Sequence, residues 1–340
     1  RTYTVFGGQM AVTDEAAELP RFGEPAPVIR IFGWSILGVM VAYLINNFLI
    51  IGYGFTPISG ILVEGGSTSI IPVLVYLVAL AAVGVYVART GNTSLRWDAR
   101  TIHNFNKYLI RAFFWTVLMT GLVDASLAFL RVEKILPTLV NEQLAIDLGR
   151  SHFVGPYIHI PLVVLGFVIA AFTRTLGFSW LALMIVGAEL SIVISRFVFS
   201  YEQALMGDLV RYWYAALFLF ASAYTLFDEG HVRVDVLYAG FKNKTRGFVN
   251  AMGSILLGVT TCWVILGVGL GGKQAIINAP VSNFEITQSG AVGMFVKYQM
   301  AAFLAIFAIT MMIQFVSYFF EAIADHRGQP GHVDHEPAAH

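Results

Sequence analysis

A few charged, histidine and asparagine side chains lie within long apolar runs, and their types could do chemistry. They are Asn46, Asn47, Asp124, His159, Glu189 and Arg196. An ionisable side chain inside a bilayer is costly and is a functional candidate by default. A series of carboxylates could relay an ion or a proton, and facing histidines could hold a haem.

The spacing of these residues argues against both kinds of chemistry. Glu189 and Arg196 share a helix face, but their separation of about 10 Å along the axis is too long for a direct pair. We expect Arg196 to extend toward the outer headgroups or to pair with Asp208. Asp124 and Glu189 stand alone in different runs, so we interpret them as buried polar contacts between helices. His159 is interpreted as structural, because a bis-histidine haem needs several intramembrane histidines.

The composition predicts the class of protein that must position these residues. Hydrophobic residues make up 57% and charged residues 12% of the chain, and the mean hydropathy is +0.72. A soluble domain carries about twice that charge. The sequence therefore predicts an all-α integral membrane protein. The formal net charge is zero, and scattered basic residues do not favour nucleic acid. The single cysteine, Cys262, excludes a disulfide framework within the chain.

Eight apolar runs are long enough to cross a bilayer. They are Ile31–Tyr53, Ser69–Val87, Ala112–Leu130, Val154–Phe172, Phe178–Val198, Tyr212–Phe227, Val249–Leu270 and Tyr298–Phe320. The sixth is short and is expected to extend back to about Ala204. An excess of basic residues on the sides of the two termini predicts that both termini are cytoplasmic. The mixed residues 1–30 do not resemble a cleavable signal peptide.

Three connections between runs are longer than turns. Residues 89–111 are basic and aromatic, so we expect them to lie along the inner headgroups. Residues 131–150 have spaced apolar side chains and are expected on the outer surface. Residues 271–293 are polar and glycine-rich, which is typical of an outer loop. The tail 326–340 lacks apolar residues and is expected to be mobile.

The second half of the chain carries an ordered series of short motifs. "SRFVFS" ends the fifth run, and "MGDLVRYWYAALFLFASAYTL" follows with Asp208, Arg211 and Tyr212. Then come "EGHVRVD", which holds His231, Arg233 and Asp235, and the basic "KNKTR". In their order and spacing, the motifs of residues 178–325 resemble the small permease subunit of tripartite ATP-independent periplasmic (TRAP) transporters, the DctQ-like family.

This resemblance implies a supporting role in the bacterial inner membrane. In that family the large permease carries an organic anion with sodium, a periplasmic binding protein delivers the substrate, and the small permease braces the large one among the lipids. The resemblance implies no enzyme activity and no catalytic residues. It also implies no cofactor in this chain and places the sodium ions in the large permease.

The organisation expected from the resemblance has four parts. These are a cytoplasmic segment 1–30, an additional four-helix region 31–174, a DctQ-like core 175–325 and the tail 326–340. The longer form has four spans that the core family lacks. Candidate interface or structural residues are Arg196, Asp208, Arg211, His231, Arg233 and Asp235.

Two of these groups have specific hypotheses. We expect the "EGHVRVD" stretch, residues 229–235, to form a structured elbow in which Arg233 and Asp235 bond the backbone or the large permease. Asp208 and Arg211 either cap a helix or contact the binding protein.

Two alternative functions stay open at this point. The chain could anchor a redox complex, although His159 is the one histidine inside a predicted span. It could also be a stand-alone carrier, but such carriers place their sites at matched, broken helices. We find no matched pair of glycine-broken spans in the sequence.

Overall fold

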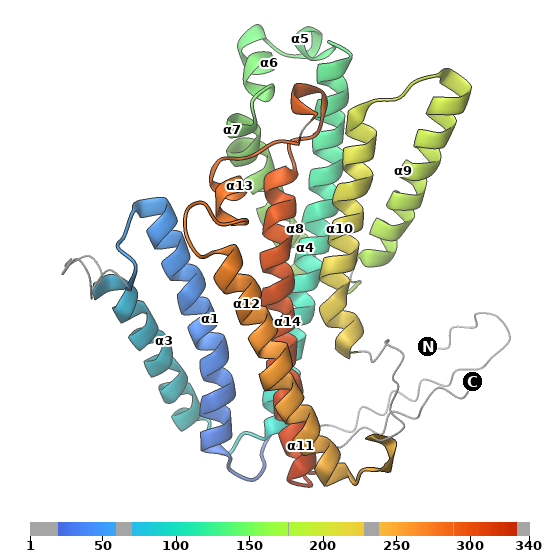
Figure 1. Cartoon of the computed structure of the whole chain (residues 1–340). Coiled ribbons are helices and arrows are strands. Elements are labelled where there is room, and N and C mark those ends of the chain that lie inside the picture. The colour runs from blue at the N-terminus through green and yellow to red at the C-terminus, as the bar shows by residue number, and fades with distance from the viewer. Residues whose placement is uncertain (1–19, 59–69, 176, 228–237, 288, 332–340) are drawn as a thin grey trace, which may run out of the picture.

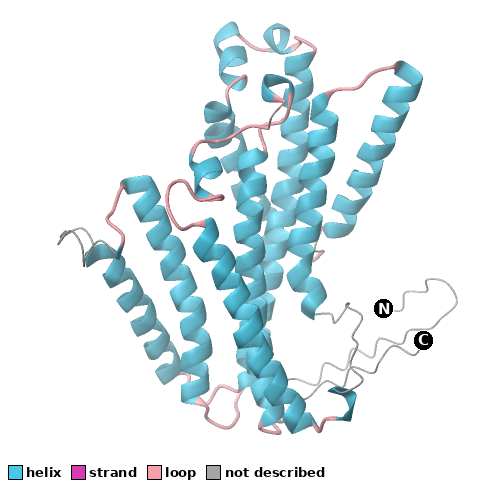
Figure 2. Ribbon diagram, viewed as in Figure 1, coloured by secondary structure: helices cyan, strands magenta, loops and turns pink. Residues whose placement is uncertain are grey.

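Long helices build the structure. The computed structural model describes residues 20–58, 70–175, 177–227, 238–287 and 289–331, and these residues contain helices but no β-strand longer than a single bridge (Figures 1 and 2). Eight helical segments of this part are long and apolar enough to cross a membrane. They are α1 (Pro27–Tyr53), α3 (Ile70–Arg89), α4 (Leu95–Val132), α7–η3–α8 (Ser151–Phe172), α9 (Phe178–Phe199), α10 (Ala204–Phe227), α11–η5–α12 (Asn243–Gly269) and α14 (Lys297–His326). The predicted all-α membrane fold and its eight spans are confirmed, including the start of the sixth at Ala204.

The two ends of the bundle can be defined from the described ends of the chain. Ser94 Oγ donates a hydrogen bond to Pro20 O at 2.7 Å, and Arg96 Nε donates to Pro330 O at 2.8 Å. Both ends of the described chain therefore meet at the start of α4. We name this the inner end, following the predicted orientation, and the opposite end the outer end.

The helix α4 differs from the prediction for residues 89–111. Ser94 caps it by accepting a hydrogen bond from the Trp97 amide at 3.2 Å, and the helix then runs unbroken to Val132. Its 38 residues extend about 57 Å, whereas the hydrocarbon core is about 30 Å thick. The expectation of a segment lying flat on the inner headgroups is wrong for residues 95–111, because they continue the spanning helix.

The helix Ser151–Phe172 contains a π-helical segment, Gly155–His159 (η3). Pro156 lies in it and cannot donate an amide hydrogen, and the wider turn keeps the helix continuous. A Cβ added at Gly155 would overlap the ring of Phe284. Glycine therefore lets the loop before α14 pack directly on this turn.

Two large hydrophobic cores hold the described bundle together, and a smaller third core lies at its outer end. The first combines α1, α4, α12 and α14 and includes the fully buried side chains of Leu95, Leu266 and Phe320. The second combines α4, α9, α10 and α14, with Phe114 and Trp213 fully or almost fully buried. Each core takes side chains from both predicted regions, 31–174 and 175–325. The additional spans thus share their packing with the remainder of the chain.

The connections at the outer end carry short helices. Residues 131–150 form α5 (Leu136–Leu139) and α6 (Glu142–Leu148), and residues 271–293 include α13 (Asn278–Ser282). Ile277 and Asn278 are only 3% and 6% exposed. The segment 271–293 is therefore partly buried between helices, rather than the fully polar loop that its composition suggests.

Candidate functional site

Two buried carboxylates hold adjacent peptide units just before α14. Asp124 of α4 accepts a hydrogen bond from the Phe295 amide at 2.7 Å, and Asp208 of α10 accepts one from the Met294 amide at 3.1 Å. Both carboxylates are at most 2% exposed. Each buried charge therefore has a fixed backbone partner, which offsets part of its desolvation cost.

Asp208 makes further contacts that depend on a glycine. Thr287 Oγ1 donates to Asp208 Oδ2 at 3.1 Å. A Cβ at Gly293 would lie 2.6 Å from the same oxygen, so only glycine fits against this carboxylate. Arg211 is 3.9 Å from Asp208 and its side chain is 73% exposed, which makes a weak pair. Asp208 thus holds the loop before α14, and its predicted role in binding a partner stays a prediction.

Arg131 closes the same loop from the end of α4. Its guanidinium donates to Gly293 O at 2.8 Å and to Leu148 O at 3.3 Å. Its Cζ atom lies 3.9 Å from the centre of the Phe295 ring, within cation–π range. Arg131 is the first residue of the segment 131–150, which the sequence placed on the outer surface, and its role in holding this loop was not predicted.

A chain of hydrogen bonds leads away from Asp124 through the bundle. His159 Nε2 lies 3.3 Å from Asp124 Oδ1, and His159 Nδ1 lies 2.8 Å from the Tyr298 hydroxyl. Gln299 Nε2 donates to that hydroxyl at 3.1 Å, and the Tyr212 hydroxyl donates to Gln299 Oε1. Four separate helical segments, α4, η3, α10 and α14, supply these five side chains.

The donors and acceptors in this series of hydrogen bonds can all be matched. If Nε2 carries the imidazole proton and donates to Asp124, Nδ1 accepts from Tyr298. Both ring nitrogens of His159 are then in use, and the ring is 1% exposed. The expectation of a buried polar contact between helices agrees with this geometry for Asp124 and His159. That these two residues meet was not expected, because they lie in different apolar runs.

The arrangement favours a structural role over a binding role. Its carboxylates accept from fixed backbone amides. No group of three or more His, Cys, Asp or Glu side chains in the described residues could hold a metal ion. The site can fix the relative positions of four helical segments and of the loop before α14.

The intramembrane asparagines also make contacts between segments. Asn46 Nδ2 donates to Pro72 O at 3.0 Å and so joins α1 to α3. Asn47 and Asn278 exchange side-chain hydrogen bonds of 3.0 and 2.9 Å, which joins α1 to α13. These pairs attach the first two spans to the body of the protein.

The inner end holds a second polar cluster, which the sequence did not reveal. Arg30 Nε lies 2.5 Å from Asp98 Oδ2, and both side chains are 0% exposed. Arg30 also donates to the carbonyl oxygen and the hydroxyl of Thr90, at 2.5 and 2.8 Å. This ion pair fastens α1 to the first turn of α4.

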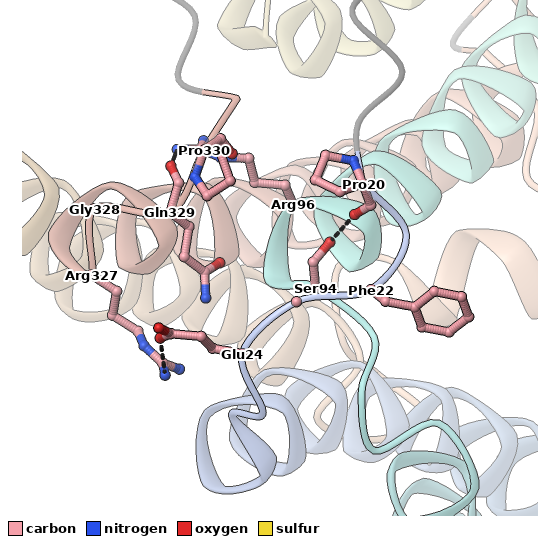
Figure 3. A pocket seen from close by; sticks show the side chains of 10 residues that line it. Pro20, Phe22, Glu24, Ser94, Arg96, Arg327, Gly328, Gln329 and Pro330 are labelled. Carbon is pink, nitrogen blue, oxygen red and sulfur yellow. Dashed lines mark hydrogen bonds and ion pairs between the residues drawn. The ribbon is translucent and has the colours of Figure 1, made fainter.

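Arg96 binds the C-terminal end of the described chain and, like Asp98, lies in the first turn of α4. Its guanidinium lies 2.6 Å from Glu321 and 2.7 Å from Asp325, and its side chain is 4% exposed. Figure 3 shows Arg96 beside Gln329 and Pro330, with the Ser94–Pro20 hydrogen bond across the same pocket. The pocket holds about 110 Å³ and is lined by chain segments from both described ends. We interpret it as a gap where these segments meet.

The remaining candidates of the fifth run lie at the surface of the bundle. Arg196 pairs with Glu202 at 3.5 Å and does not pair with Asp208, which corrects one of the two expectations. Glu189 is exposed on α9, so the expectation of a buried polar contact between helices is wrong for this residue. Tyr201 donates to Glu133 at 2.5 Å, which ties the loop after α9 to the end of α4. The pKa of the Tyr201 phenol is raised, mainly because that hydrogen bond to the carboxylate holds its proton.

Part of the predicted interface falls outside the described residues. His231, Arg233 and Asp235 belong to residues 228–237, so the elbow hypothesis stays a prediction. The basic residues that follow open α11, whose Gly247 packs against the backbone of α14.

The fold and the site together define a class. The chain is a multi-pass membrane protein whose described buried carboxylates hold its own helices and loops in place. Residues 182–325 match the family model of the "Tripartite ATP-independent periplasmic transporters, DctQ component". This part of the chain belongs to that family, whose members are the small permease subunits of TRAP transporters.

Family membership settles three further points. The protein is a transporter component of the inner membrane and is not an enzyme. The spans before residue 182 are consistent with a long form of the family. Comparisons with curated proteins and with solved structures gave no match.

Proposed function

We propose that this small permease braces a large permease for the sodium-coupled symport of an organic acid. In this proposal a periplasmic binding protein delivers the substrate, and the sodium ions and the substrate bind in the large permease. This chain holds no cofactor of its own and contacts its partner and the surrounding lipids. The observation that carries the proposal is the family match over residues 182–325.

The geometry of the polar groups supports a bracing role. Asp124, Asp208 and His159 are buried and engaged with partners in this chain. Binding an ion or an anion among them would require breaking these hydrogen bonds, at a cost of about 1–3 kcal/mol for each group left unsatisfied. A rigid subunit suits a scaffold against which another protein moves.

Reconstitution into liposomes tests the proposal. We expect uptake of an organic acid when this chain, its large permease and the binding protein are present together with an inward sodium gradient. Uptake by this chain alone would identify a stand-alone carrier and overturn the proposal. A haem absorption spectrum from the purified chain would instead favour the anchor of a redox complex. The engagement of both nitrogens of His159 predicts no such spectrum.

A further inference from the structure

The helix α9 is the span that leans away from the bundle in Figure 1. The structure describes the whole of α9, and only Leu181 and Ile185 are buried, both in its inner half. Most residues of its outer half are exposed. This part of α9 offers a lateral surface that the described residues do not cover.

Glu189 lies midway along α9 on this surface and differs from the other carboxylates within the spans. Asp124 and Asp208 are buried and receive backbone amides. Glu189 is exposed, and no hydrogen bond or ion pair joins it to another residue that the structure describes. The arginine two turns away, Arg196, already pairs with Glu202.

Neither lipid nor a second copy of the chain suits this carboxylate. Acyl chains offer no hydrogen-bond donor at the middle of the bilayer, and the headgroups lie about 15 Å away. A second copy packed symmetrically on the same surface would bring two Glu189 side chains together, and like charges repel. The chemistry that fits is a helix carrying a hydrogen-bond donor.

The residues around Glu189 form a stripe that such a helix could cover. Ala182, Val186, Glu189 and Val193 follow the i, i+4, i+7, i+11 spacing of one helix face, which we name the α9 flank. Val186 and Val193 are 64% and 49% exposed. Small and β-branched side chains let two helices approach closely, and a polar group at the contact then selects its partner.

We propose that the α9 flank docks a transmembrane helix of the large permease, which places a lysine, arginine or amide side chain opposite Glu189. This inference rests on the proposed function, because it names the surface through which the brace holds its partner. The apolar residues supply the packing area, and Glu189 fixes the depth and the orientation of the partner helix.

Cross-linking from defined positions tests where the partner sits. The complete chain is co-expressed with its large permease, with a photoreactive residue at Val186 or Val193 and, as the matched control, at Leu77 of α3. Leu77 is 56% exposed and lies on a different span. We expect adducts with the large permease from positions 186 and 193 and none from position 77. Adducts only with lipid, adducts between two copies of this chain, or adducts from position 77 alone would overturn the inference.

Substitution of the carboxylate gives an independent measurement. Glu189→Gln keeps an acceptor, whereas Glu189→Leu removes it, so the second change should lower recovery of the large permease by about tenfold and the first by less. Neither should shift the thermal unfolding of this chain alone, because Glu189 has no described partner within it. If both variants recover as much large permease as the unsubstituted chain, the docking role is refuted. If the unsubstituted chain retains no large permease at all, the proposed function itself fails.

Discussion

Arg30 and Asp98 form an ion pair in which both side chains are completely buried, with 2.5 Å between Nε and Oδ2. The pair joins the first span to the start of the 38-residue helix α4. A buried pair contributes little net stability compared with apolar side chains, but loss of one partner leaves an uncompensated charge. The pair therefore makes the attachment of α1 specific.

Removing one charge of the Arg30–Asp98 pair should destabilise the protein more than removing both. We expect Arg30→Met or Asp98→Leu to lower the free energy of unfolding by about 3–5 kcal/mol. The double variant should lose less than either single variant, because no isolated charge remains. Thermal unfolding in detergent measures this, and a double variant as unstable as the sum of the singles would contradict it.

The Asp124 carboxylate should be essential for the loop before α14. Asp124→Ala removes the acceptor for the Phe295 amide and the partner of His159, so we expect a loss of about 2–4 kcal/mol. The matched control is Glu202→Ala, since Glu202 is 58% exposed and, among the described residues, pairs with the surface residue Arg196 alone. Its effect should stay within about 0.5 kcal/mol. Equal unfolding temperatures for both variants would show that the contact is not needed.

Close packing between α4 and α8 should depend on Gly166. A Cβ at this position would overlap the Thr116 hydroxyl and lie 2.8 Å from the Thr116 amide nitrogen. We expect Gly166→Ala to cost about 1–3 kcal/mol by overpacking. Gly84→Ala in α3 is the control, because no atom lies within 4 Å of its added Cβ. The two unfolding midpoints, measured side by side, decide the prediction.

The additional spans should associate with the rest of the chain even when the backbone is cut. Fragments 1–174 and 175–340, expressed together, should copurify, because both large hydrophobic cores contain side chains from each fragment. Fragment 175–340 alone should aggregate, since it lacks two hydrogen-bond partners. These are the Asp124 carboxylate, which accepts from the Phe295 amide, and the His159 imidazole, which bonds the Tyr298 hydroxyl. A monodisperse, helical fragment 175–340 would mean that the additional spans are dispensable for folding.

Hydropathy was sufficient to predict the spans because a crossing helix needs about 20 apolar residues in one run. Residues 95–111 were misassigned because they are polar although they belong to a spanning helix. Their polar side chains look like an interfacial segment, yet His103 lies 3.1 Å from Gln314 and Asn106 donates to Thr310 O at 2.9 Å. Partners more than 200 positions away in the sequence satisfy these groups, and no local pattern reveals such partners.

The candidate site was predictable residue by residue but not as a network. Asp124 and His159 stood out because each is a lone polar group in an apolar run. Their meeting depends on which helices are neighbours, and the resemblance to the family covers neither residue. The Tyr298–Gln299 pair gave a weak signal as two polar side chains at the start of the last span. Arg30 and Asp98 gave none, because both lie outside the predicted runs.

The distance in sequence between Asp124 and the Phe295 amide also has a consequence for biosynthesis. The two residues are 171 positions apart, so a ribosome working at about 5–20 residues per second needs roughly 10–35 s to make the second after the first. During this interval α4 is already inserted, and its Asp124 carboxylate has not yet met the Phe295 amide that donates to it. An insertase or chaperone that shields α4 until α14 emerges would protect the growing chain through that delay.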